Sequence, residues 1–392
     1  MPRVCHICEG SETVMEKGKV LYVNGNEAVV EGAIAAGCRF YAGYPITPSS
    51  EIAEEMSKRL PAVGGMYVQG EDELASINMI VGASMAGAKA MTATSGPGYS
   101  LMQEGLGLAI ATETPIVIVD VMRAGPSTGI ASKAWQGDIM QARFGSHSDY
   151  EIISLYASSV QEAFDLTVEA FNLAETYMTP VIMLSDGVLA RMRERLYVRG
   201  QNELSIVSRK KPADSPESYM PYKRGEDYIP AIANFGEGYF VLKDSLTHDE
   251  RGYYYERPDV QAKFVLGITE KIRRNASKIY RWEEAYTDDA EVLFVASGVM
   301  GRIASVMVRE ARAEGKKWGI FRPISIWPFP EDALRRAARN ASKVITIEMS
   351  VGKLIYPVKW SLRDGQEVSV LPWLSYEPPS PDDLLNLLEV KA

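Results

Sequence analysis

Three acidic residues precede an apolar run in QGEDELASIN, residues 69–78. Glu71 and Asp72 can favour a helix N-terminus, because carboxylates interact well with the positive end of the helix dipole. Glu73 differs, because it leads into the mostly apolar run LASINM, which predicts a buried helix. A buried carboxylate either finds a partner or has a raised pKa. The sequence therefore singles out Glu73 as a carboxyl group with unusual surroundings.

A glycine-rich turn separates a strand-like run from a helix-like run in TATSGPGYSLM, residues 92–102. Such a turn can point backbone N–H groups at a phosphate or another anion. The segment matches neither the G-x-G-x-x-G fingerprint nor the P-loop spacing with lysine. Close packing of the backbone against a neighbouring element is the other explanation of these glycines.

The segment FYAGYPITPSSEIAEEM, residues 40–56, runs from an aromatic strand through two prolines into an acidic helix. A helix tolerates proline in its first turn, which is where we expect Pro48. Thr47 is then the predicted N-cap, with Glu51 near the positive end of the helix dipole. Helix capping alone is enough to explain a threonine at this position.

Arg123 follows the apolar strand IVIVDV and begins a polar, glycine-rich loop, RAGPSTGIASKAWQGD. Arginine is suited to a bidentate grip on a carboxylate. A solvated surface arginine is the plain alternative, but a position at the carboxyl end of a strand favours contact with a ligand.

The elements that must position these residues alternate between apolar strands and helices over residues 20–196. Strands that are apolar throughout and alternate with helices predict a parallel sheet covered on both faces. We therefore expect a doubly wound α/β domain over residues 18–205, with ligands bound at the carboxyl ends of its strands. The segments described above follow predicted strands, so they should meet at that edge.

The remaining residues predict three further regions. Residues 206–287 are rich in charges, tyrosine and proline and show little periodicity, which predicts an irregular connecting segment. The alternation resumes with DAEVLFVASG and KVITIEMS, and predicts a smaller C-terminal α/β domain over residues 288–392. Residues 1–17 are an N-terminal extension.

Composition excludes several classes of protein. The 392 residues are 46% hydrophobic and 24% charged, which is ordinary for a globular protein. The formal charge of -9 argues against nucleic acid or an anionic membrane as a partner, since both reward basic patches. No window reaches the length of a membrane span, and the N-terminus lacks the apolar core of a signal peptide. We expect a cytoplasmic protein.

Two of the three cysteines, Cys5 and Cys8, stand on either side of His6. A C-x2-C pair could donate two ligands to a metal, but a structural zinc site needs four, and the chain has no second pair. The pair is therefore a peripheral appendage or half of a site that another chain completes. We expect no metal site made by this chain alone.

Taken together, GYPITPSS, EDELASINMIVGASMAGAKAMTATSGPGYSLMQE, RAGPSTG and SVQEAFDLTVEAFNLAE resemble the α subunit of the 2-oxoacid:ferredoxin oxidoreductases. The T-S-G-P-G loop resembles that of the 2-oxoglutarate-type branch. The resemblance is strong over residues 25–197, and WPFP, IEMSVGKL and LTHDERG extend it over most of the chain, though not over residues 1–17. It implies a thiamine-diphosphate pyrimidine-binding domain, followed by a transketolase C-terminal-like α/β domain.

The resemblance also implies roles for individual residues. Glu73 aligns with the catalytic carboxylate that hydrogen-bonds the aminopyrimidine ring of thiamine diphosphate and acts as the acid/base group of the protein. Thr47 and Arg123 align with contacts to the carboxylate and carbonyl of a 2-oxoacid substrate. The other expected cofactor contacts are Tyr44, Pro45, Ile46, Ser95, Gly96, Pro97 and Gly98.

Half of a thiamine site is missing from the sequence. Thiamine enzymes hold the diphosphate and Mg²⁺ with a G-D-G motif followed by asparagine, and the nearest match here is SDGVL, residues 185–189, without a fitting asparagine. Three cysteines are too few for a four-thiolate iron–sulfur cluster. The resemblance therefore implies a divided enzyme with a β subunit that carries the Mg²⁺ site and a [4Fe–4S] cluster. It further implies γ and δ subunits, ferredoxin and coenzyme A.

The expected function is the oxidative decarboxylation of a 2-oxoacid to acyl-CoA and CO₂, with the electrons passed to ferredoxin. One alternative is a transketolase-like thiamine enzyme without electron transfer. Another is a noncatalytic regulatory subunit that holds a nucleotide with TSGPG. Iron–sulfur content and turnover of a 2-oxoacid would distinguish the three.

Overall fold

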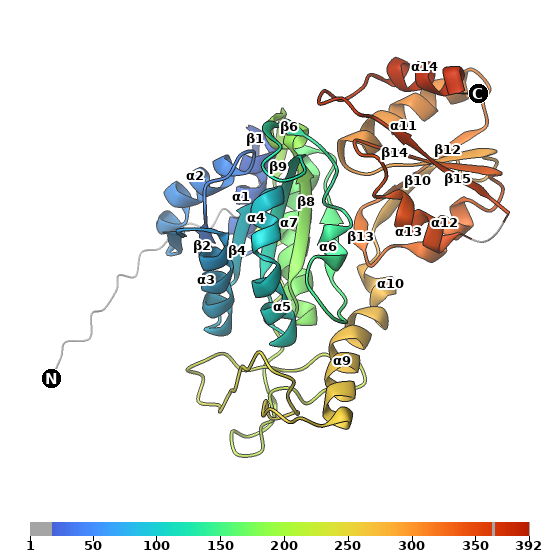
Figure 1. The fold of residues 1–392 in the computed structure, drawn as a ribbon. Helices are drawn as coiled ribbons and strands as arrows, with labels where there is room; N and C mark the ends of the chain where they lie inside the picture. The colour runs from blue at the N-terminus through green and yellow to red at the C-terminus, as the bar shows by residue number, and fades with distance from the viewer. Residues whose placement is uncertain (1–17, 363–364, 392) are drawn as a thin grey trace.

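The computed structural model describes residues 18–362 and 365–391, which form the two lobes drawn in Figure 1. The larger lobe is coloured blue to green, and the smaller lobe is coloured orange to red. A looped segment and helix α9, in yellow, lie at the lower end of the larger lobe. Cys5, His6 and Cys8 lie outside the described residues, so the expectation for them stays open.

The larger lobe is built on an eight-stranded sheet with the order β13-β7-β8-β5-β4-β2-β3, in which β6 also pairs with β5. Strands β4, β5 and β8 are buried along their whole length, as expected for a parallel sheet covered on both faces. The predicted doubly wound domain is therefore confirmed. The parallel strands are β2 (Phe40–Gly43), β3 (Met66–Gln69), β4 (Ala90–Thr94), β5 (Val117–Ala124), β7 (Ile153–Tyr156) and β8 (Val181–Asp186).

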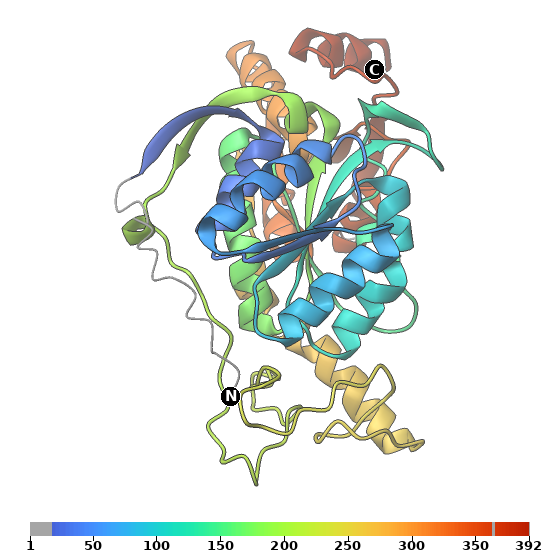
Figure 2. The same cartoon turned by 90° about the vertical axis from the view of Figure 1, so that its left-hand side faces the viewer.

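Helices cover the sheet in two layers (Figure 2). The first layer contains α1 (Gly25–Ala35), α2 (Ser50–Arg59) and α7 (Val160–Tyr177), and the second contains α3 (Glu73–Met85), α4 (Gly96–Leu101) and α5 (Gln103–Ala111). Val117 and Val119 of β5 pack into the first layer, whereas Ile118 and Met122 pack into the second. Because strand side chains alternate between faces, Asp120 shares the face of the second layer.

The segments singled out in the sequence meet at one edge of this sheet. Tyr44 follows β2, Gly70 follows β3, Ser95 follows β4, and Arg123 lies in the last two residues of β5. Strands β3, β2, β4 and β5 are parallel neighbours. Their carboxyl ends therefore bring the segments together, as the sequence predicts.

The polar loop after Arg123 is more regular than predicted. Strand β6 (Ile130–Ala134) folds back antiparallel to the end of β5, with Arg123 opposite Ala134. The parallel pairings of β5 reach Asp120 on one side and Met122 on the other, so its last residues extend beyond both neighbours. Their backbone groups need partners, and β6 supplies them.

The smaller lobe has a five-stranded sheet with the order β10-β12-β11-β14-β15, which is parallel except at β10. Besides the covalent chain, strand pairing connects the two lobes: β13 (Ser325–Trp327) pairs antiparallel with β7 of the first sheet. The other elements are β10 (Trp282–Ala285), β11 (Val292–Val295), β12 (Trp318–Pro323), β14 (Lys343–Glu348), β15 (Glu367–Pro372), α11 (Gly298–Ala313), α12 (Glu331–Ala337), α13 (Ile355–Ser361) and α14 (Pro381–Lys391).

Short elements complete the larger lobe. β1 (Lys19–Asn24) and β9 (Arg193–Val198) form a separate antiparallel ribbon. The remaining pieces are η1 (Pro61–Val63), α6 (Gln141–Phe144), α8 (Gly187–Arg191) and η2 (Gln201–Glu203). None of the helices in the described part of the chain is long and apolar enough to cross a membrane.

The connecting segment is irregular only in its first part. From residue 206 to residue 257 it contains bends and two isolated bridges, but it then forms α9 (Pro258–Arg273) and α10 (Ala276–Ile279). The prediction of irregular structure is wrong for α9, which begins with a proline in its first turn and an acidic Asp259. Its buried side, formed by Val260, Gly267, Ile268 and Ile272, recurs at helical spacing.

Candidate active site

Glu73 is the first residue of α3, and Asp72 caps that helix by accepting a hydrogen bond from the Ala75 N–H at 2.7 Å. The Glu73 side chain is only 4% exposed, and no cation of the described residues forms an ion pair with it. Burial raises the pKa of Glu73, Asp72 raises it further, and the charge of Arg123 opposes the shift. The predicted burial of Glu73 is confirmed, and of the two outcomes that the sequence left open, a partner or a raised pKa, the structure shows the raised pKa.

The apolar sequence of α3 suggested a helix buried on all sides, but one part of its surface is exposed. Ile77 is buried, but Leu74 and Met79 on the same helix are exposed. Tyr44 and Leu101, on the segments that follow β2 and β4, are exposed as well. Large apolar side chains are therefore exposed on α3, on α4 and on the turn after β2.

The glycine-rich turn packs directly against Glu73. A Cβ atom at Gly98 would overlap both the Glu73 carboxylate and the Thr94 hydroxyl, so only glycine lets the backbone approach this closely. The Gly98 N–H donates to the Ser95 carbonyl at 2.8 Å, and the Gly96 N–H donates to Asp120 Oδ1 at 3.2 Å. Two N–H groups are thus engaged, one of them by a carboxyl group, and the structure supports close packing rather than a phosphate cradle.

The sequence prediction for the turn that contains Thr47, with Thr47 as the N-cap of α2, is wrong. Helix α2 begins at Ser50, with Ser49 in the N-cap position, so Thr47 is not the cap and Pro48 is not in the first turn. The buried Asn26 bonds both this turn and the helix, because its amide donates to the Pro48 carbonyl at 2.8 Å and to the Glu51 carboxylate at 2.9 Å. The Thr47 hydroxyl has no hydrogen-bond partner in the described part of the chain and is free to contact a ligand.

Arg123 is buried, with an exposed fraction of 7%, so the surface alternative is wrong. Its Nη1 donates to the Thr47 carbonyl at 2.8 Å, and its Nη2 donates to the Thr128 carbonyl at 2.9 Å. Arg123 therefore ties the Thr47 turn to the β5–β6 hairpin. Its Nε is buried without a partner among the described residues, and the guanidinium keeps further N–H donors for an anion.

Two carboxyl groups beside this site were missed in the sequence. Asp120 lies inside β5 with no exposed surface, and the Asp138 carboxyl group, in the loop after β6, acts on its pKa from nearby. Asp138 lies close to Gly96 and Arg123. The signal for Asp120 was an acid in the middle of an otherwise apolar strand, VIVDVM, but no feature of the sequence pointed to Asp138.

The nearest match to a diphosphate motif, SDGVL, has a structural role. Asp186 is fully buried and accepts hydrogen bonds from the N–H groups of Val188 at 3.1 Å and Leu189 at 3.0 Å, which caps α8. It also accepts a hydrogen bond from the Tyr156 hydroxyl at 3.2 Å. The described residues hold no group of three or more His, Cys, Asp or Glu that could bind a metal ion.

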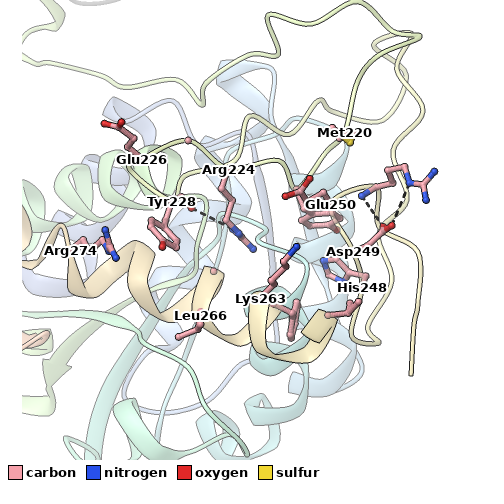
Figure 3. A pocket seen from close by; sticks show the side chains of 16 residues that line it. Met220, Arg224, Glu226, Tyr228, His248, Asp249, Glu250, Lys263, Leu266 and Arg274 are labelled. Atoms are coloured by element: carbon pink, nitrogen blue, oxygen red, sulfur yellow. Dashed lines mark hydrogen bonds and ion pairs between the residues drawn. The ribbon is translucent and has the colours of Figure 1, made fainter. Parts of the chain in front are cut away.

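A separate cavity of about 1090 Å³ lies between the connecting segment and α9 (Figure 3). Lys263, His248 and Glu250 line it together with Arg224 and Arg274, and none of the predicted site residues does. The connecting segment packs where α3 ends, since the Phe235 N–H donates to the Met85 carbonyl, and just beyond α5, since Arg224 pairs with Glu113. The cavity is thus at the amino edge of the first sheet, away from Glu73.

Comparison with protein families matches both lobes. Residues 31–264 match the model of the thiamine-diphosphate-binding domain of pyruvate flavodoxin/ferredoxin oxidoreductases. Residues 290–377 match the model of core domain II of pyruvate:ferredoxin oxidoreductase. The first match alone covers more than half of the chain.

Comparison with individual proteins gives the same result. The chain is 47% identical to 2-oxoglutarate synthase subunit KorA of Methanothermobacter marburgensis, over 93% of this chain and 97% of that protein. It is 41% identical to ketoisovalerate oxidoreductase subunit VorB of Methanothermobacter thermautotrophicus, over 85% of this chain and 87% of that protein.

Solved structures agree with the fold. A 2-oxoglutarate:ferredoxin oxidoreductase from Magnetococcus marinus, with 2-oxoglutarate, coenzyme A and succinyl-CoA bound, superposes with a TM-score of 0.90 at 33% identity. That match covers 95% of this chain but 65% of the longer chain in the solved structure. A split-gene transketolase superposes with a TM-score of 0.54 at 13% identity, which shows a shared fold alone.

Proposed function

The chain belongs to the 2-oxoacid:ferredoxin oxidoreductases, as an α subunit with the thiamine-diphosphate-binding domain, and from this premise we propose that its 2-oxoacid is 2-oxoglutarate. We further propose that Glu73 is its acid/base group. The substrate proposal rests on the T-S-G-P-G loop and on the name of the relatives at 47% identity. The proposal for Glu73 rests on its position in the structure.

The observation that carries the site is a buried carboxyl group without a counterion at the carboxyl edge of the sheet. Glu73 can accept or share a proton with a ring nitrogen, and burial brings its pKa closer to the working pH, as acid/base catalysis requires. Thr94 Oγ1 and Ser95 Oγ are buried next to it without partners in the described structure. The donor set therefore fits a polar, flat heteroaromatic ring such as the aminopyrimidine.

The other residues orient the two ligands. Thiamine diphosphate, when bound, supplies the carbanion chemistry that decarboxylation of a 2-oxoacid requires. The proposed cofactor contacts come from the turns after β2 and β4, where Gly98 allows the close approach. The Thr47 hydroxyl and the spare N–H donors of Arg123 are proposed to hold the substrate carboxylate and carbonyl. The remaining proposed contacts are Tyr44, Pro45, Ile46, Ser95, Gly96 and Pro97.

The chain supplies only part of the complete enzyme. Its relatives are named as subunits, and the exposed Tyr44, Leu74 and Leu101 give a partner an apolar surface beside Glu73. We propose that a β subunit covers this surface and brings the diphosphate, the Mg²⁺ site and an iron–sulfur cluster. We also propose γ and δ subunits, ferredoxin and coenzyme A as partners, and a cytoplasmic location. The proposed domain boundaries of this chain are at residues 17, 205 and 287.

The substrate proposal is tested on the purified complex with 2-oxoglutarate, pyruvate and 2-oxoisovalerate, each with coenzyme A and a viologen dye. We expect the highest kcat/KM for 2-oxoglutarate. 2-Oxoisovalerate is the sharpest competitor, because a relative at 41% identity is named for ketoisovalerate. A preference for 2-oxoisovalerate would overturn the substrate but keep the family. A complex that turns over a 2-oxoacid without reducing the dye would favour the non-redox alternative.

The divided site is tested on the isolated chain. One charge-assisted hydrogen bond contributes roughly 1.5–3 kcal/mol, which is less than the cost of association of about 4 kcal/mol or more. Calorimetry should therefore detect no micromolar binding of thiamine diphosphate with Mg²⁺ until the β subunit is added. Tight binding by the chain alone would show that it contains its own diphosphate site.

A further inference from the structure

We propose that Asp120 and Asp138 share one proton, and that this pair positions the turn of residues 95–98 against Glu73. Neither residue belongs to the proposed contacts of cofactor or substrate. Both act through the backbone of the turn, so they are positioning residues. The effect on turnover rests on the proposed role of Glu73, whereas the shared proton can be tested without turnover.

The geometry favours a proton shared by the two carboxyl groups. Asp120 Oδ1 accepts the Gly96 N–H at 3.2 Å, which leaves Oδ2 for another partner. Asp120 Oδ2 and Asp138 Oδ2 are both buried, and no donor of the described residues reaches either atom. Both carboxyl groups lie beside Gly96, because Asp120 Oδ1 accepts its N–H and Asp138 Oδ2 lies 3.9 Å from where a Cβ atom of Gly96 would be. The charge and hydrogen-bonding capacity of each group act on the pKa of the other. Ionised carboxylates only accept hydrogen bonds, so this arrangement is stable when one of them carries a proton.

The groups around the pair decide which carboxyl group holds the proton. Tyr99 and Tyr156 face Asp120, and both are fully buried with pKa values well above the ordinary tyrosine range, so they stay neutral. The cations Arg123 and Lys353 act on Asp138. The negative charge is therefore more stable on Asp138, and the proton belongs on Asp120.

The titration behaviour agrees with this arrangement. Burial and the neighbouring Asp138 raise the pKa of Asp120 well above its ordinary value. Burial also raises the pKa of Asp138, to about 6, against the lowering effects of Asp120 and Arg123. At neutral pH the pair thus holds one proton and one negative charge, as in other pairs of carboxyl groups that share a site.

The pair reaches Glu73 through the turn. Asp120 fixes Gly96, and the Gly98 N–H donates to the Ser95 carbonyl within the same turn. Gly98 in turn touches the Glu73 carboxylate. A shift of the turn would therefore change the position of Glu73, while Arg123 would keep its own bonds to Thr47 and Thr128.

Infrared spectroscopy of the full-length chain at pH 8 tests the shared proton directly. Exposed carboxyl groups are ionised at this pH, so a band of protonated carboxylic acid reports buried groups. We expect this band in the wild type and in the exposed control Glu104→Gln, and we expect its loss in Asp120→Asn. If the band survives in Asp120→Asn, or disappears only in Glu73→Gln, the proton is not on the Asp120–Asp138 pair and the proposal is wrong.

Kinetics of the whole complex test the positioning role. In Asp120→Asn the amide can donate to Asp138 and still accept the Gly96 N–H, so we expect kcat within about threefold of the wild type. Asp120→Ala removes the bond to Gly96, and the net value of a hydrogen bond predicts a loss of kcat of about 5- to 10-fold. The KM for the 2-oxoacid should change less, because Arg123 stays in place.

The conservative variant separates this role from mere packing. Melting temperatures of both variants should be measured first, and kcat compared per folded complex. Rescue by asparagine but not by alanine supports the proposal. Equal losses in the two variants, or no loss in either, would contradict it. If the complex oxidises no 2-oxoacid at all, the proposed function fails, and the infrared result still decides whether the proton is shared.

Discussion

The two edges of the first sheet both bury carboxyl groups, but they treat them in opposite ways. At the amino edge, Glu113 is fully buried between Lys271 Nζ at 2.7 Å and Arg224 Nη2 at 2.7 Å. Burial raises its pKa, but these two cations outweigh it and lower the pKa to about 2. At the carboxyl edge, Glu73 is buried without an ion pair, and burial raises its pKa.

This difference separates a structural site from a chemical one. The connecting segment has little regular structure before α9, and its buried charges hold it to the sheet. Arg224 reaches Glu113, and Arg209 reaches Glu175 at 2.7 Å. Fully paired buried charges of this kind fix the position of a segment. A buried carboxyl group left unpaired is destabilising, and such groups cluster at functional sites.

Glu73→Gln should have the largest effect. A positioned acid/base group contributes about 10²- to 10⁴-fold to a rate, so kcat of the complex should fall by at least about 10²-fold. The stability should not fall, because Gln removes a buried charge that has no counterion. Glu71→Gln, an exposed neighbour on the same turn, is the matched control. Near-normal turnover in Glu73→Gln would remove Glu73 from the mechanism.

Glu113→Gln should show the reverse pattern. Removing one partner of a buried ion pair costs about 3–5 kcal/mol, because Lys271 and Arg224 are left uncompensated. Urea unfolding of the chain should report this loss, while kcat per folded complex should remain unchanged. Glu226→Gln, an exposed acid of the same segment, is the control. A large loss of kcat with normal stability would mean that the amino edge takes part in catalysis.

Arg123→Ala tests whether a paired arginine can also serve the substrate. A charge-assisted hydrogen bond contributes roughly 1.5–3 kcal/mol, so kcat/KM for the 2-oxoacid should fall by about 10- to 100-fold. The affinity for thiamine diphosphate should change less. Arg191→Ala is a matched control, because Arg191 also donates to a carbonyl of the β5–β6 hairpin, that of Ser132, but from an exposed position. Equal losses for both ligands would make Arg123 a structural residue.

Acid should weaken the ion pairs of Glu113 at the amino edge. The pKa of Glu113 falls from 4.5 to about 2 on folding, so its ion pairs stabilise the chain fully above pH 4.5. This contribution is lost as the pH drops from 4.5 towards 2, because the unfolded state then binds more protons. The unfolding free energy of the wild type should therefore decrease over this range, and Glu113→Gln should show a shallower decrease. Parallel pH profiles of the two proteins would contradict the assignment.

Much of the fold could be predicted because its signals are local. Strands such as IVIVDV are apolar apart from one acid, and the segments that follow them have turn residues, so the sequence predicts which residues end at the carboxyl edge. The burial of Glu73 followed from the apolar run after it. Helix α9 was missed because the charged, tyrosine-rich residues before it hid a helical spacing of only a few apolar positions.

By itself the sequence determined the alternation of strands and helices, the family, the lack of a G-D-G motif, and the edge at which Glu73, Thr47 and Arg123 lie. Only the tertiary structure decided what these groups contact. Asn26 bonds the Thr47 turn and α2, Arg123 bonds two turns, and Asp138 comes close to Asp120 from another loop. Periodicity and turn chemistry act between residues a few positions apart, whereas hydrogen bonds and buried charges depend on how distant segments pack.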